Sequence, residues 1–221
     1  MTIEFLLDSW KFFRAHFFIL AVIVLAFTVP LEIVSMFYRQ LIDYEGSYFL
    51  MVLPEVVNVL FYPIYGAAIV FYMASVLDGQ RLSVSEAWGL GLKHWASYLV
   101  LSVILIIAIS FGMALFILPG LFLAAKFAFS EFELLLKNKN PIDSLSSSWQ
   151  QTEKHLWTLL KGGLVITGVI YLPYMLVIRI VGDLSSYGDL LGSVSRIIES
   201  LLMVLYTVFA FRVYDYASGE A

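Results

Sequence analysis

The chain has 221 residues, of which 61% are hydrophobic and only 14% are charged, and its mean hydropathy is +0.90. Soluble domains carry about 25% charged residues because their surface must be solvated, so this composition indicates a protein whose solvent is lipid. The net charge of −4 includes no basic block, and the chain has no cysteine. These features argue against a nucleic-acid partner and exclude disulfides, thiolate metal ligands and thiol nucleophiles.

The N-terminal segment predicts a helix at the membrane surface rather than a cleaved signal peptide. Glu4 and Asp8 stand where a signal peptide would be basic, and no small-residue cleavage site follows the first apolar run. On a helix, Glu4, Asp8 and Lys11 share one face, while Trp10 lies on the opposite, apolar face. We therefore expect an amphipathic helix before the first membrane span.

Apolar runs predict six membrane spans, since a spanning helix needs about 20 mostly apolar residues. The third and fourth spans come from one apolar block, residues 98–136, which we divide at Leu118-Pro119-Gly120 because a Pro-Gly pair favours a tight turn. The sequence thus predicts an all-α, single-domain bundle of six transmembrane helices. The spans cover about residues 17–33, 51–77, 98–118, 120–136, 157–180 and 194–214.

The distribution of basic residues predicts the orientation of these spans. Nine of the 13 Lys and Arg residues fall on the side of the predicted termini. Three, Arg39, Arg179 and Arg196, fall on the opposite side, and Lys126 lies inside a span. Cytoplasmic segments of membrane proteins are enriched in Lys and Arg, so both termini are expected in the cytoplasm.

Three segments with the same spacing predict an internal repeat. Each has a tryptophan six residues before a histidine, and each precedes a predicted pair of spans. The second opens with the capping box Ser83-Val84-Ser85-Glu86 and the third with Asn140-Pro141-Ile142-Asp143. We expect three units of interfacial amphipathic helix plus transmembrane hairpin, over residues 1–77, 82–137 and 140–216. The markers are Trp10 and His16, Trp88 and His94, and Trp149 and His155.

These marker residues allow two interpretations. Tryptophan prefers the headgroup region of a bilayer, where histidine can also be hydrated, so the pairs are typical of interfacial anchors. The alternative is a ring of three imidazoles that binds a divalent metal near a pseudo-threefold axis. Because no two candidate ligands are adjacent in sequence, we predict no metal site and no cofactor.

Several of these stretches also resemble a known family. The chain is similar to the YciC-like family of uncharacterised bacterial inner-membrane proteins and to the membrane domain attached to some glycerophosphodiester phosphodiesterases. The resemblance implies a six-span protein of the bacterial inner membrane and implies no activity. It rests on Trp10-Lys11-Phe12-Phe13-Arg14, Leu118-Pro119-Gly120, Lys126, Asn140-Pro141-Ile142-Asp143-Ser144-Leu145, Ser148-Trp149-Gln150-Gln151-Thr152 and Phe211-Arg212-Val213-Tyr214.

Ionisable residues inside the predicted spans are the candidate functional residues, because such residues are costly in lipid. Lys126 lies six residues after Gly120, about 9 Å along a helix, and we predict that it pairs with Glu55 or Glu199.

Nearer the cytoplasmic side, Glu133 shares the helical face of Lys126 while Glu131 points elsewhere, and Arg212 is the expected partner of one of the two carboxylates. The pairs either lock the bundle or line a polar pathway, and the sequence leaves both open. Pro54, Asn58, Pro63 and Gly66 also weaken the second span, as in helices that line cavities.

No catalytic motif is present: the chain has no G-x-S-x-G, H-E-x-x-H, P-loop or G-x-G-x-x-G sequence. We therefore predict a non-enzymatic membrane protein that moves or accommodates a small solute or lipid. The alternative is a structural or partner-binding membrane protein in envelope homeostasis, and a third is an intramembrane enzyme acting on lipid headgroups. Expected partners are membrane lipids and either another membrane protein or a second copy of the chain.

Overall fold

The computed structural model describes residues 1–41, 48–181 and 188–219, and this part of the chain contains eight helices and no strand. The all-α prediction is confirmed for these residues. The helices are α1 (Thr2–Leu41), α2 (Tyr48–Leu77), α3 (Val84–Leu115), α4 (Ile117–Lys126), α5 (Ser130–Lys137), α6 (Pro141–Gln151), α7 (Leu156–Val181) and α8 (Gly188–Gly219).

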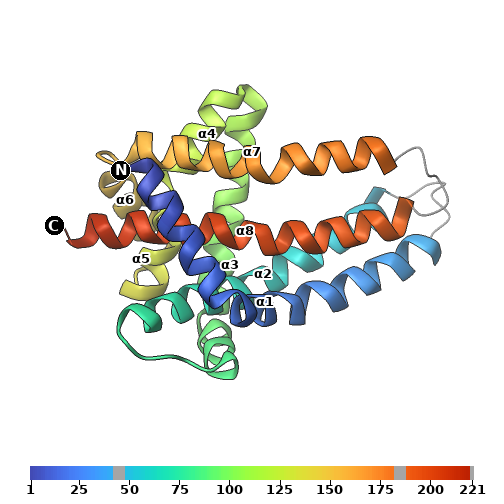
Figure 1. Cartoon of the computed structure of the whole chain (residues 1–221), viewed down its shortest axis with the longest axis horizontal. Coiled ribbons are helices and arrows are strands. Elements are labelled where there is room, and N and C mark those ends of the chain that lie inside the picture. The colour runs from blue at the N-terminus through green and yellow to red at the C-terminus, as the bar shows by residue number, and fades with distance from the viewer. Residues whose placement is uncertain (42–47, 182–187, 220–221) are drawn as a thin grey trace.

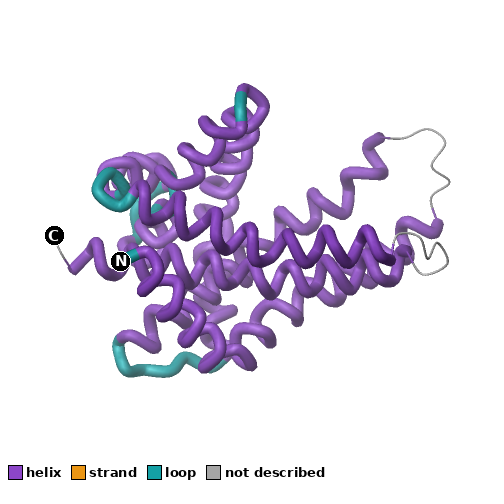
Figure 2. Tube along the Cα trace, turned by 45° about the horizontal axis from the view of Figure 1, so that its top comes forward, coloured by secondary structure: helices purple, strands orange, loops and turns teal. Residues whose placement is uncertain are grey.

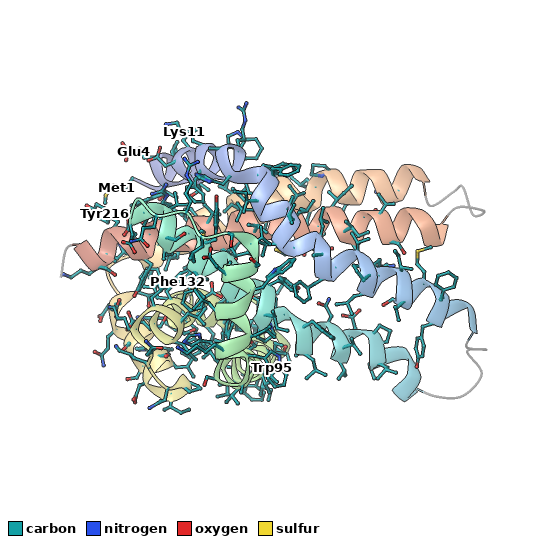
Figure 3. The ribbon with its side chains drawn as sticks, turned by 90° about the horizontal axis from the view of Figure 1, so that it is seen from below. Met1, Glu4, Lys11, Trp95, Phe132 and Tyr216 are labelled. Carbon is teal, nitrogen blue, oxygen red and sulfur yellow. The ribbon has the colours of Figure 1, made fainter. Side chains whose placement is uncertain are left out.

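Four long helices, α1, α2, α7 and α8, form a bundle along the long axis of the molecule (Figure 1). The two termini lie at one end of this bundle, where α5 and α6 also pack. The first part of α1 turns away from the rest of that helix and lies near the end of α8 (Figure 3). There the rings of Phe5 and Tyr216 are in edge-to-face contact at 5.4 Å.

The hairpin of α3 and α4 runs across the bundle axis, and its connection lies at the side of the molecule (Figures 1 and 2). Glycine permits close crossing at two places. A Cβ at Gly91 of α3 would collide with the carbonyl oxygen of Ile64 in α2, and one at Gly112 would lie 2.9 Å from the Cα of Gly120 in α4. Small residues allow such backbone-to-backbone packing of apolar helices.

The predicted turn at Leu118-Pro119-Gly120 is wrong. The chain reverses at Phe116, the only residue between α3 and α4, and Pro119 lies in the first turn of α4. Backbone N–H groups in a first helical turn have no intrahelical acceptor, so proline costs nothing there. Pro119 therefore begins a helix instead of ending one.

Five helical segments of the described chain are long and apolar enough to span a membrane: Thr2–Tyr38, Val52–Leu77, Val84–Leu115, Leu156–Pro173 and Gly192–Gly219. The predicted fourth span, residues 120–136, is not one helix. The chain leaves helical geometry after Lys126 and resumes it at Ser130, so α4 and α5 have only 10 and 8 residues.

The predicted interfacial helices differ from one another. The Ser83 capping box and the Asn140 cap with Pro141 in the first turn are confirmed. However, only the third segment forms a separate helix, α6, whereas the second continues unbroken into α3. This difference counts against three equivalent units, and the threefold repeat stays a prediction.

Candidate functional site

A cavity of about 590 Å³ lies between α1, α2 and α8. Its walls come from the second half of α1 and from the first half and middle of α2 and α8, so it extends from the middle of the bundle toward the end away from the termini (Figure 1). Polar and charged side chains line much of it: Thr28, Glu32, Ser35, Glu55, Asn58, Tyr62, Tyr65, Arg196, Glu199, Ser200, Tyr206 and Thr207.

The sequence features that weaken α2 form part of this wall. Pro54, Asn58 and Gly66 all line the cavity. Proline lacks a backbone donor and glycine lacks a side chain, so both leave space beside a helix that leucine or phenylalanine would fill. Asn58 accepts a hydrogen bond from the Tyr65 hydroxyl at 3.4 Å.

The charges of the cavity are only partly compensated. Arg196 donates two hydrogen bonds to Glu32, at 2.5 and 3.0 Å. Glu199 accepts a hydrogen bond from the Tyr171 hydroxyl. Glu55 has no hydrogen bond or ion pair within the described chain, and neither Glu55 nor Glu199 pairs with Lys126, contrary to the prediction. The wall therefore holds three carboxyl groups and one guanidinium group.

A chain of hydroxyl groups leads from this cavity to Glu131 of α5. The Tyr98 hydroxyl lies 2.5 Å from the Glu131 carboxylate and 3.3 Å from the hydroxyl of Tyr62, which lines the cavity. Glu131 lies outside the five candidate spans. Burial raises its pKa to about 7, and the hydrogen bond from Tyr98 opposes this shift.

Lys126 has a different partner from the one predicted. It is 6% exposed, and its ammonium group donates to the backbone carbonyl of Trp149 at 3.0 Å and lies 5.1 Å from the centre of that indole ring. Within the described chain it makes no ion pair. Because α4 runs across the bundle and ends at Lys126, the residue meets α6 and not the cavity that holds Glu55 and Glu199.

The break after Lys126 is stabilised by hydrogen bonds from α6 and the residue that follows it. Ser148 and Thr152 donate to the Lys126 carbonyl at 2.8 and 3.1 Å, and the Ser148 hydroxyl accepts from the Phe129 N–H at 3.1 Å. Buried backbone groups at a helix end need such partners. These contacts give the Ser148–Thr152 stretch a structural role.

Glu133 is fully buried in a cluster of donors, the Glu133 cluster. Lys137, Lys139 and Tyr214 contact its carboxylate at 2.9, 2.6 and 2.9 Å. Burial alone would raise its pKa, but hydrogen bonds from Lys139, Lys137, Gln151 and Tyr214 lower it to about 2.

Arg212 does not pair with Glu131 or Glu133; instead its guanidinium lies 5.0 Å from the ring centre of Phe12. Sequence reasoning missed the lysine partners of Glu133, although Lys137 follows it by four residues, the spacing of side chains on one helical face.

The three histidines lie in separate environments. His16 hydrogen-bonds to Tyr72 at 2.8 Å, His94 to Asn138 at 3.1 Å, and the ring of His155 contacts that of Tyr216. Within the described chain, no three potential ligands come close enough to hold a metal ion. The tryptophans differ as well, since Trp10 and Trp149 are exposed whereas Trp88 packs edge-on against Phe27.

Residues 87–218 match the family model described as Domain of unknown function (DUF7847). This match covers more than half of the chain. The protein belongs to the DUF7847 family. No curated protein and no solved structure matches it.

The DUF7847 match includes α4, α5 and α6, and with them Lys126, Glu131 and the Glu133 cluster. It also includes Glu199 on the α8 side of the cavity. Glu32 and Glu55 precede the matched segment. The family model thus covers one wall of the cavity and the whole of the Glu133 cluster.

Proposed function

We propose that this DUF7847 protein is a non-enzymatic integral membrane protein that moves or accommodates a small solute or lipid in the cavity between α1, α2 and α8. One observation carries the proposal: a cavity of about 590 Å³ that contains Glu55 without a partner in the described chain. Ligand sites usually measure about 300–1,000 Å³. Ionisable side chains within spans are costly and typically mark substrate or ion paths.

The charges of the wall favour a cationic or zwitterionic ligand. With Glu32 neutralised by Arg196, Glu55 and Glu199 leave the cavity with an excess of acidic groups. Tyr62, Tyr65 and Tyr206 add aromatic surface, and aromatic faces attract cations. An anionic ligand would meet repulsion from both carboxylates.

The proposed orientation places the bundle axis along the membrane normal of a bacterial inner membrane, with both termini in the cytoplasm. Four long helices share that axis, and an even number of crossings returns the chain to its starting side (Figure 1). The positive-inside rule then selects the side. In this proposal α3, although long and apolar enough to span, lies with α4 across the bundle axis, and the hairpin begins and ends at the bundle (Figure 1). The hairpin therefore adds no net crossing, and both termini stay on one side.

Single cysteines test this orientation cleanly because the chain contains none of its own. Cysteines at Ser47 and Ser186, which lie outside the described residues, should react in intact cells with a membrane-impermeant maleimide. A cysteine at the exposed Ser146 of α6 should react only after the cells are opened. Reaction of Ser146→Cys in intact cells would reverse the proposed orientation.

The cavity itself is tested by a Ser200→Cys variant, whose thiol replaces a hydroxyl of the wall. We expect the ratio of the reaction rates of trimethylammonioethyl methanethiosulfonate, a cation, and sulfonatoethyl methanethiosulfonate, an anion, to be about tenfold higher here than with a free thiol in solution, because acidic clefts concentrate cations.

Adding Glu55→Gln should reduce this preference, whereas Glu153→Gln on the exposed surface should leave it unchanged. No reaction with either reagent in the folded protein, together with full reaction after denaturation, would contradict a ligand cavity.

The structural or partner-binding alternative is favoured by one observation, the Glu133 cluster, in which every charge is paired inside the protein. It predicts that the two reagents react at Ser200→Cys with the same rate ratio as with a free thiol in solution. It also predicts that, where deletion of the protein gives cells a phenotype, Glu55→Gln gives none.

A further inference from the structure

Three side chains from three helices form a contact path between the cavity and α5. Tyr62 of α2 lines the cavity, its hydroxyl lies 3.3 Å from that of Tyr98 in α3, and Tyr98 lies 2.5 Å from the Glu131 carboxylate. The Tyr98 hydroxyl is placed to donate to Glu131 at 2.5 Å and to the Tyr62 oxygen at 3.3 Å, and its single hydrogen serves one acceptor at a time. When Tyr98 donates to Glu131, rotation of the Tyr62 hydroxyl lets Tyr62 donate to the Tyr98 oxygen and accept from the cavity.

We propose that Glu131 is a proton-binding site coupled to the cavity, and that Tyr98 and Tyr62 carry protons between them. This inference rests on the proposed function, since it couples the protonation of Glu131 to the binding of a solute in the cavity. Chains of hydrogen-bonded hydroxyls polarise one another and provide a continuous path for a proton.

Each transfer along this path is balanced. The Tyr98 O–H bond breaks as its proton moves to the Glu131 carboxylate, the Tyr62 O–H proton moves to the Tyr98 oxygen, and a donor in the cavity replaces the proton of Tyr62. Both tyrosines end as neutral phenols, and the carboxylate has gained one proton. The reverse sequence returns that proton to the cavity.

The groups around Glu131 suit a site that gains and loses a proton. The elements packed against α5 include α2, α3 and α6. Tyr98 of α3 contacts Glu131, Tyr62 of α2 contacts Tyr98, and Tyr206 of α8 lies close enough for the charge of Glu131 to act on it. On α6, Asp143 bonds to Asn140 instead. Within the described chain, no lysine, arginine or histidine forms an ion pair with Glu131.

Glu133, two residues further along α5, shows the contrast. Two lysines hold it ionised, with a pKa of about 2, whereas burial without a cation raises the pKa of Glu131 to about 7. Near neutral pH, therefore, Glu131 changes its charge and Glu133 does not. The same helix thus carries one fixed carboxylate and one that responds to pH.

Infrared difference spectroscopy of the purified protein tests the site without a known ligand. Between about pH 5 and pH 9, the wild type should show one carboxyl band that titrates close to neutrality, and Glu131→Gln should remove it. Tyr98→Phe should shift this titration to higher pH, because the carboxylate loses its donor. Tyr72→Phe is the matched control, because Tyr72 is another tyrosine of α2 whose hydroxyl bonds to His16 and which does not line the cavity.

The relay is tested by the rate at which this band responds to a rapid pH jump. Tyr62→Phe keeps the hydrogen bond between Tyr98 and Glu131 but interrupts the path to the cavity, so it should slow the response at least about tenfold, while Tyr72→Phe should not. A wild-type Glu131 that titrates with ordinary carboxyl groups would overturn the site. An unchanged rate in Tyr62→Phe would overturn the path.

These failures are distinguishable from failure of the proposed function. Reaction of Ser200→Cys with the two charged reagents reports on the cavity whether or not Glu131 titrates. Melting curves of each variant at about pH 5 identify any that does not fold, and Glu131→Gln should melt like the wild type there, since both then carry a neutral side chain.

Discussion

The Glu133 cluster and the cavity hold acidic groups in opposite ways. In the cluster, one fully buried carboxylate accepts from two lysines and a tyrosine. In the cavity, three carboxyl groups share one guanidinium, and Glu55 has no partner in the described chain. The first arrangement satisfies a charge with protein groups, while the second leaves charge available to something else.

The comparison separates a structural ion network from a candidate binding site. A buried charge whose partners come from α5, the following loop and α8 fixes those segments relative to one another, and its removal strands the remaining charges. Neutralising a carboxylate that faces an open volume changes the free energy of unfolding little, because water or a ligand already solvates it. Neutralising Glu133 should therefore lower the free energy of unfolding, whereas neutralising Glu55 should change only how charged reagents react in the cavity.

The largest expected effect is on the Glu133 cluster. Glu133→Ala should lower the free energy of unfolding by about 3–5 kcal/mol, because it leaves Lys137, Lys139 and Tyr214 without their shared acceptor. Titration with sodium dodecyl sulfate in mixed micelles measures this, with Glu153→Ala on the exposed surface as control. Equal stability of the two variants would show that the cluster does not hold the helices together.

The cluster also predicts a dependence on pH. Because the pKa of Glu133 lies below the ordinary carboxyl value of 4.5, its contribution is fully present above about pH 4.5 and is lost as the pH falls toward 2. Glu133→Gln should lack this component of acid unfolding.

A smaller loss is expected where α6 stabilises the break after α4. Ser148→Ala removes the acceptor of the Phe129 N–H and one donor to the Lys126 carbonyl, which should cost about 1–3 kcal/mol. Ser146→Ala, exposed on the same helix, should change stability by less than about 0.5 kcal/mol. If both variants melt together, the break does not depend on Ser148.

Lys126→Met should change stability by less than about 1 kcal/mol. The variant loses the bond to the Trp149 carbonyl but also removes a buried cation that has no acid beside it, and these effects oppose each other. Lys154→Met on the exposed surface is the control, measured by the same detergent titration. A loss of several kcal/mol would reveal a carboxylate partner and would make the site resemble the Glu133 cluster.

The smallest stability effect belongs to the cavity. Glu55→Gln should leave the free energy of unfolding within about 0.5 kcal/mol of wild type, because no protein group depends on its charge. The same variant should nevertheless slow the cationic reagent at Ser200→Cys. A strongly destabilised Glu55→Gln protein would place Glu55 in a structural network and remove the contrast between the two regions.

Local patterns in the sequence determined the helices and several of their ends. Apolar runs gave the all-α architecture, the Ser83 box and the Asn140 cap were confirmed, and Pro54, Asn58 and Gly66 marked the helix that borders the cavity. Each of these depends on residues within a few positions of one another, so spacing alone is informative. The i, i+4 pair of Glu133 and Lys137 belongs to the same class and could have been found.

Only the tertiary structure decided which charges meet. The prediction for Lys126 assumed a helix running through the membrane, but α4 crosses the bundle and ends there, so Lys126 contacts Trp149. Tyr98 meets Glu131 across 33 positions of sequence and Tyr62 across 36. Such contacts depend on the angle at which α3 crosses α2, which Gly91 permits by close approach. Spacing along the chain carries no information about that angle, because helices of the same composition pack at several crossing angles.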